Sequence, residues 1–270
     1  MKKVFKILIQ SVFILSISNP TFSYENTENK NDDKIIWEKY NKNILLFNYT
    51  DENKDKINEI EKYFLNYHII EDFFHHKFRK NINVYIFPNR KLLDTYWKTK
   101  SQCWMVASGS ENELDLLSPS IWEKESCEHK NNKEEIEKII LHEMVHVYHD
   151  QYTEPTNFEG MDELGWLIEG LATYVANQID EKRIKNIKKA ILNNEIPKNL
   201  EDLWQGNNKY GFSGYMVKFI DENFGREKLF NLLSCSKNKD ILIKLDLKEE
   251  KLLELFKKYI ENDVKKYDKK

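Results

Sequence analysis

Two histidines and a glutamate lie at a spacing that suits metal-assisted hydrolysis. The segment reads Ile-Ile-Leu-His142-Glu143-Met-Val-His146, with the histidines four residues apart. In a helix, residues at i and i+4 lie on one face, about 6 Å apart along the axis, so both imidazoles can reach one ion. Glu143 then projects toward the adjacent open side, where it can act on a water molecule. The pattern predicts Zn²⁺ as the cofactor; the alternative is a pair of core histidines beside a surface glutamate.

A third metal ligand is predicted from an isolated carboxylate. Glu169 is the only charged residue between Leu164 and Ile179, and no basic residue lies three or four positions from it. A carboxylate in so apolar a helix is costly unless it is paired or bound to a metal. Zinc held by two imidazoles needs a further protein ligand, so we expect this helix to pack against the histidine helix. His149 is the weaker candidate, because one straight helix cannot wrap three histidines around an ion, and we expect it at the cleft rim or on the surface.

Hydrophobic periodicity indicates which elements must position these residues. Strands are expected at 43–49, 82–87, 104–107 and 114–117, with a turn of Ser-Gly-Ser-Glu-Asn composition at 108–112. Helices are expected at 52–74, 91–97, 133–150, 162–180, 181–193, 212–224, 226–235 and 247–260. A small sheet followed by a helical half predicts the α+β fold class.

The N-terminus has the features of an export signal. Three lysines within the first six residues precede an apolar run at 7–18. This run is shorter than the stretch of about 20 residues that spans a bilayer. Thr21 and Ser23 have the two-residue spacing that signal peptidase prefers. We predict a signal peptide at 1–23, cleaved near Ser23, and a secreted, extracellular protein without stable membrane insertion; a retained anchor is the alternative.

The chain behind this leader reads as one soluble domain. Residues 24–34 lack apolar content and predict a disordered spacer, which leaves 35–270 as the folded domain. Without the three leader lysines, 39 basic residues stand against 45 acidic ones, a net charge of −6. Phosphate binding needs a positive surface, so nucleic acid is disfavoured as a partner. No pattern indicates an oligomeric state.

Three cysteines leave the disulfide pattern open. Outside the cell, Cys103 and Cys127 could close a loop just before the histidine helix, which would leave Cys235 free. Geometry decides such a pairing, so both the paired and the reduced forms remain alternatives.

The two motifs together resemble the gluzincin zinc metallopeptidases of the peptidase MA-like superfamily. His-Glu-x-x-His is followed by Trp-x-x-Glu-Gly-x-Ala-x-Tyr at 166–174, which is similar to the aminopeptidase N-like core. The resemblance implies a zincin-like (thermolysin-like) domain in which His142, His146 and Glu169 bind zinc and Glu143 is the general base. This chain departs from the family at Ile168, where Asn is common, and in a longer connection between the motifs. The element order is similar over 43–259, although only the two motifs are specific.

The resemblance also implies an oxyanion donor and a substrate-binding strand. The family's tyrosine matches Tyr210 in Lys-Tyr-Gly-Phe-Ser-Gly-Tyr, with Tyr215 as the alternative; packing roles for both are a further alternative. A strand edge above the zinc helix binds extended substrate in such enzymes, and Trp104 to Gly109 is the matching segment, with Ala107 and Gly109 as contact residues. A strand paired on both sides is equally compatible with the sequence.

These residues predict a secreted zinc peptidase, by default an endopeptidase, that acts on peptide or polypeptide substrates. One alternative is an aminopeptidase in which Glu111 grips the substrate amine, since Ser-Gly-Ser-Glu-Asn echoes the family's Gly-x-Met-x-Asn turn without its Gly and Met. Another is a catalytically inactive binding protein with the zincin fold. A purely structural zinc site is disfavoured because such sites close all four positions with Cys and His.

Overall fold

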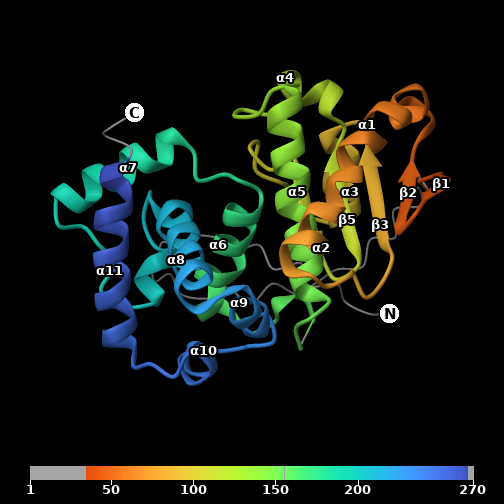
Figure 1. The fold of residues 1–270 in the computed structure, drawn as a ribbon. Helices are drawn as coiled ribbons and strands as arrows, with labels where there is room; N and C mark the ends of the chain where they lie inside the picture. The colour runs from red at the N-terminus through yellow and green to blue at the C-terminus, as the bar shows by residue number, and fades with distance from the viewer. Residues whose placement is uncertain (1–34, 155, 267–270) are drawn as a thin grey trace, which may run out of the picture.

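The computed structural model of the protein describes residues 35–154 and 156–266, so the predicted leader and spacer lie outside the described residues. It confirms a mixed α+β architecture, in which a small sheet comes first and the rest is mostly helical. Figure 1 shows the sheet and its helices on one side and the later helices on the other. Among the described residues, no helix has the length and apolar character needed to cross a membrane.

Five strands form one mixed sheet. They are β1 (Glu38–Lys42), β2 (Leu45–Tyr49), β3 (Ile82–Phe87), β4 (Ala107–Ser110) and β5 (Glu113–Leu117). Their order is β1-β2-β3-β5-β4, with β2, β3 and β5 parallel and the two outer strands antiparallel to their neighbours. β4 therefore lies at one edge of the sheet and pairs with β5 alone among the described strands. The alternation in β3, where Ile82, Val84 and Ile86 are fully buried, places its apolar face in the core.

The β4–β5 hairpin differs from the sequence prediction. β4 begins at Ala107 rather than at 104, and the turn is only Glu111 and Asn112 instead of 108–112. Glu111 has a φ of 50°, the left-handed conformation of a tight turn. Ser108 to Ser110 have turn-like composition, but they pair with β5 and belong to the strand.

The sheet half contains α1 (Ile57–Phe64), α2 (His68–Phe74), α3 (Arg90–Trp97), α4 (Trp122–Glu125) and α5 (Lys133–Asp150), with 3₁₀ turns at Asp51–Lys56, Leu65–Tyr67 and Pro119–Ile121. The single long helix expected at 52–74 is wrong, because 3₁₀ turns break it into two short helices. The first 3₁₀ turn, Asp51–Lys56, contains only Asp, Glu, Asn and Lys residues. Asp and Asn side chains compete with the backbone for hydrogen bonds in a helix interior, which disfavours an α-helix there. α5 has the bounds expected from sequence, and the Asn132 side chain accepts from the Glu135 N–H as its N-cap.

The helical half contains α6 (Gly165–Val175), α7 (Glu181–Leu192), α8 (Lys209–Phe224), α9 (Arg226–Leu232), α10 (Asn238–Leu245) and α11 (Glu249–Lys266), with 3₁₀ turns at Thr156–Phe158, Asp162–Leu164 and Glu201–Trp204. α6 is shorter than the predicted 162–180, since a 3₁₀ turn precedes it and Asn177 adopts a left-handed conformation after it. α10 was not expected from the sequence.

α5 lies between the two halves and connects the sheet to the helices. It contacts β4 on one side and α6 on the other, and α6 in turn packs on α8. This explains why α5 is apolar around most of its circumference near the histidines. Gly170 permits the close approach of α6 and α8, because a Cβ there would lie 2.5 Å from the carbonyl oxygen of Ser213. The packing of α6 between α5 and α8 brings Glu169 to the histidines.

Candidate active site

Three of the predicted ligands meet in the structure. His142 and His146 extend from α5, and Glu169 extends from the first half of α6. The two Nε2 atoms are 3.1 Å apart. The Glu169 Oε2 atom lies 3.3 Å from Nε2 of His142 and 3.7 Å from Nε2 of His146. The three donor atoms therefore face one common point.

The spacing of these atoms fits a tetrahedral metal. Zinc bonds to nitrogen and oxygen of about 2.0–2.1 Å give a tetrahedron whose edges are about 3.3–3.4 Å. The observed separations of 3.1–3.7 Å span that value. Within the described part of the chain, no fourth His, Cys, Asp or Glu side chain joins the group. Two imidazoles and one carboxylate with an open fourth position is a donor set used by catalytic rather than structural zinc sites.

His142 is oriented by Gln178, a residue that the sequence did not single out. The Gln178 Nε2 group donates to the carbonyl oxygen of Lys138 at 3.3 Å. Its Oε1 atom is thereby turned toward Nδ1 of His142, 3.0 Å away. Nδ1 must then carry the proton, which leaves the Nε2 lone pair directed at the common point. No local signal marks a loop glutamine as such a partner, because the contact joins residues 36 positions apart.

Burial and the neighbouring charges together set the protonation of His146 and Glu169. Burial lowers the pKa of His146 to about 4, although the Glu169 charge opposes this, so the imidazole is neutral near pH 7. Burial raises the pKa of Glu169, but the adjacent histidines more than offset this and bring it below its ordinary value. A neutral imidazole and an ionised carboxylate are the forms that bind a metal ion.

Glu143 has the protonation behaviour of a general base. Burial raises the pKa of its carboxyl to about 7; the Glu169 charge adds to this, while His142 and the Gly109 N–H oppose it. The Gly109 N–H donates to Oε2 of Glu143 at 2.8 Å. A carboxyl with a pKa near the working pH can both take up and return a proton. Its contact with Gly109 also ties α5 to the edge strand.

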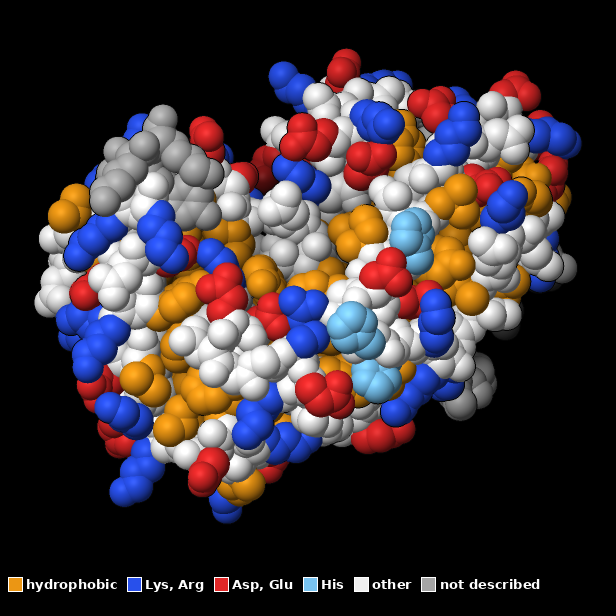
Figure 2. Space-filling view, in the orientation of Figure 1, with side chains coloured by type: hydrophobic (Ala, Val, Ile, Leu, Met, Phe, Trp, Pro, Cys, Tyr) orange, Lys and Arg blue, Asp and Glu red, His pale blue; other side chains and the backbone are white. Residues whose placement is uncertain are grey.

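The site opens into a cleft of about 740 Å³. One wall is formed by β4 and the residues before it, including both Ala107 and Gly109, and the other includes Trp204, Lys209 and Tyr210. The space-filling view shows the surface hollowed between the sheet half and the helical half (Figure 2). Because β4 is an edge strand, it is not the strand paired on both sides that the sequence also allowed. Its free edge is a template for pairing with an extended chain.

The two candidate tyrosines occupy different places. Tyr210 lines the cleft at the start of α8, and its ring packs edge-on against Trp204 with centroids 4.9 Å apart. Burial and then the charges of Glu169 and Glu143 raise its pKa, so the phenol keeps its proton and can donate. Tyr215 is fully buried in the core and is not among the residues that line the cleft.

Glu111 lies outside the residues that line the cleft. It sits in the β4–β5 turn, where its Oε1 atom accepts from the side chains of Thr156 and Asn157. Its backbone N–H also donates to the Asp150 carboxylate. The structure therefore engages Glu111 in joining the hairpin to the segment after α5.

The expectation for His149 is wrong. The side chain is fully buried rather than at the rim or on the surface. Its Nε2 atom lies 3.2 Å from the carbonyl oxygen of Leu233, to which it donates, and Phe158 packs against the ring. Burial lowers its pKa to about 3, so it is neutral. The reason is tertiary: the segments after α5 and after α9 fold over the last turn of α5.

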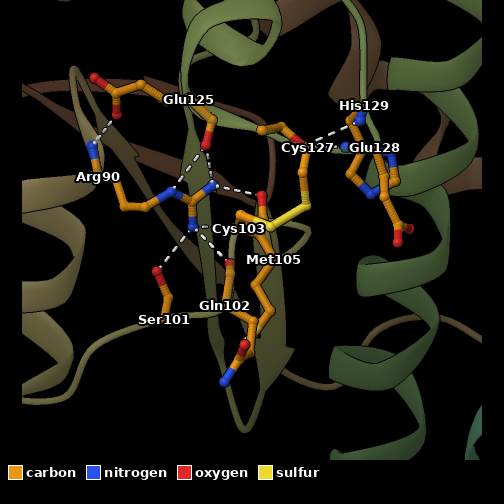
Figure 3. The surroundings of a disulfide bond; sticks show 10 residues. Arg90, Ser101, Gln102, Cys103, Met105, Glu125, Cys127, Glu128 and His129 are labelled. Atoms are coloured by element: carbon orange, nitrogen blue, oxygen red, sulfur yellow. Dashed lines mark hydrogen bonds between the residues drawn. A yellow bond between two sulfur atoms is a disulfide. The ribbon is translucent and has the colours of Figure 1, made fainter.

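The structure also resolves the pairing of the cysteines. Cys103 and Cys127 form a disulfide, and Cys235 is buried and free. The disulfide joins the segment that leads into β4 to the segment that follows α4 (Figure 3). The residues next to the two cysteines, Gln102, Trp104 and Glu128, line the cleft.

A family model described as BSP, peptidase of plants and bacteria, matches residues 94–231. The matched span contains the His-Glu-x-x-His helix, Glu169, Gln178, Tyr210 and the edge strand. A comparison with curated proteins gave no match.

Proposed function

The chain belongs to the family of peptidases of plants and bacteria, and from this premise we propose that it is a zinc-dependent peptidase of the gluzincin type. His142, His146 and Glu169 would hold the zinc. The observation that carries the proposal is the tetrahedral spacing of these three donors beside Glu143 in one cleft. Two ligands and the base on one helix, with the third ligand on the next helix, is also the arrangement expected of a thermolysin-like core.

Zinc bound there would polarise a water molecule and the carbonyl of the scissile peptide bond. Glu143 takes the proton of the attacking water as its oxygen adds to the carbonyl carbon. The carbonyl oxygen gains negative charge, and the Tyr210 hydroxyl donates a hydrogen bond to it, a contribution of about 2–4 kcal/mol. Glu143 then returns the proton to the nitrogen as the carbon–nitrogen bond breaks, which yields a carboxylate and an amine.

The substrate would lie along β4 as an additional strand. An extended polypeptide can pair with the free edge of this strand, with backbone groups around Ala107 and Gly109 as partners. Glu111 is engaged with Asn157 rather than lining the cleft, which favours an endopeptidase over an aminopeptidase that anchors the terminal amine.

We further propose that the protein is exported. The predicted signal at 1–23 supports this, and so does the Cys103–Cys127 disulfide, because such bonds persist mainly in oxidising compartments outside the cytosol. The domain at 35–270 would then act on extracellular polypeptide, and its net charge disfavours nucleic acid as a partner.

Replacing Glu143 with Gln tests the proposal directly. The variant is expected to bind zinc in a 1:1 ratio and unfold like the wild type, while hydrolysis of a peptide pool falls by about 10²–10⁴-fold. Glu134→Gln is the matched control, since this carboxylate lies on the same helix with its side chain 77% exposed. Metal analysis and mass spectrometry of the pool, with and without chelator, provide the measurements.

Three results would contradict the proposal. Full activity of the Glu143→Gln variant would exclude Glu143 as the general base. Full activity of protein from which a chelator has removed the metal would exclude a role for zinc in catalysis. A wild-type protein that binds zinc and cleaves nothing in the pool would favour the inactive binding protein.

A further inference from the structure

The turn that leads into β4 places an exposed tryptophan at the cleft. Trp104 is 45% exposed and lines the cleft wall together with Trp97 and Met105. The other large apolar residues that are exposed in the described chain are Ile36, Ile69, Leu192 and Ile243, and none of them lines the cleft. An exposed tryptophan at the wall of this cleft offers a large, rigid apolar surface to a bound partner.

The backbone around Trp104 is held in place from several directions. Met105 N–H donates to the carbonyl oxygen of Gln102 at 3.0 Å and closes a tight turn. The neighbouring Cys103 is covalently tied to Cys127. Figure 3 shows the Arg90 guanidinium beside this disulfide, and it donates to four backbone carbonyls, those of Gln102, Cys103, Met105 and Glu125. The disulfide and the hydrogen bonds from Arg90 therefore fix the backbone of this turn, while the side chain of Trp104 remains partly exposed to solvent.

We propose that Trp104 is a specificity-determining residue that packs against an apolar side chain of the peptide substrate. This inference rests on the proposed peptidase function. The substrate class is a polypeptide with an aromatic or large aliphatic residue at a set distance from the cleaved bond. A pre-positioned ring binds such a side chain without first having to be ordered, which is the physical advantage of the disulfide and of Arg90.

The distance from the cleaved bond follows from β4. Gly109 touches Glu143, so a substrate paired with β4 has its scissile bond near Gly109. Trp104 is five residues earlier, and five residues extend at most about 18 Å. The turn at Gln102–Met105 shortens this path. Trp104 therefore meets a substrate side chain a few residues from the cleaved bond, and very short peptides do not reach it.

The test compares Trp104→Ala and Trp104→Phe with the wild type on an unbiased peptide pool. The wild type is expected to favour large apolar residues at one position away from the cleaved bond, and Trp104→Ala to lose that preference. For a peptide that carries the favoured residue, KM should rise about 10-fold in Trp104→Ala with kcat changed less than about twofold. Trp104→Phe should recover most of the preference.

Ile243→Ala provides the matched control, because it truncates an apolar side chain that is 65% exposed but lies outside the cleft lining. This control is expected to keep both the preference and KM. A Trp104→Ala variant with unchanged preference, or with an equal loss on every peptide regardless of length and side chain, would overturn the inference.

Binding without turnover separates this inference from the proposed function. Peptides with and without the favoured apolar residue are labelled and titrated by anisotropy into Glu143→Gln and into Glu143→Gln/Trp104→Ala. Binding that is about 10-fold weaker in the double variant, for the apolar peptide only, supports the role of Trp104. Equal binding of both peptides by both variants refutes it, whether or not the wild type hydrolyses peptides.

Discussion

A single methyl group at Gly109 should uncouple the edge strand β4 from the histidine helix α5. A Cβ added at this position would lie 2.2 Å from the carbonyl oxygen of Glu143 and 2.9 Å from its carbonyl carbon. These are backbone atoms inside α5, so they cannot rotate away as a flexible side chain would. Gly109 does not have a left-handed φ. Glycine is therefore required at this position for lack of space, and not for its backbone conformation. Restoring an ordinary contact of about 3.5 Å requires β4 to retreat by at least about 1.3 Å.

The magnitude follows from that displacement. Overpacking of this kind costs about 1–3 kcal/mol of the free energy of unfolding. The 2.8 Å hydrogen bond from the Gly109 N–H to Glu143 would be lost as the strand moves. Misplacement of substrate by about 1 Å can reduce the rate by about 10²-fold, so we expect kcat/KM of Gly109→Ala to fall by about that factor. Zinc content should not change, because all three ligands come from α5 and α6.

Urea unfolding, zinc analysis and cleavage of a fixed peptide measure the three quantities. Ser110→Ala is the matched control, since it lies next in the same strand and removes an atom rather than adding one. If Gly109→Ala unfolds and cleaves like the wild type, the close contact between β4 and α5 is wrong, and the substrate path along this strand loses its support.

Two further predictions concern groups around the site. Gln178→Leu should weaken zinc binding about 10–100-fold, as judged by competition with a chelator, because His142 loses the acceptor that orients it. Gln178→Glu keeps an oxygen facing Nδ1 and should retain most of the affinity; equal loss in both variants would argue against orientation. Burial raises the pKa of Asp150 to about 6, while the N–H groups of Glu111 and Asn157 lower it. The folded protein therefore binds this proton more tightly than the unfolded chain, and the stabilisation is present below about pH 4 and lost as the pH rises through about 6. As the pH rises from 4 to 6, the unfolding free energy of the wild type, measured with urea, should fall relative to that of Asp150→Asn. The same difference in unfolding free energy between the two proteins at both pH values would exclude a contribution from the Asp150 proton.

Elements with strong local signals were predicted well. The α5 bounds follow from helical spacing, and β3 stops before Pro88. Where local signals conflict with distant contacts, the prediction failed. Ser108 to Ser110 have the composition of a turn, yet they form part of β4 because they pair with β5. His149 looks like a surface residue on the helix pattern, yet a chain segment 84 positions away covers it.

The sequence by itself determined which atoms can form the site, because helical spacing places His142 and His146 on one face, and an isolated Glu169 in an apolar helix is costly unless it is paired or bound to a metal. Only the tertiary structure decided how those atoms are aimed. The Gln178 amide orients His142, the edge position of β4 gives the cleft a free strand, and the Cys103–Cys127 disulfide with Arg90 fixes the turn of Trp104. Each of these contacts joins residues far apart in the chain, so no local spacing or composition encodes it.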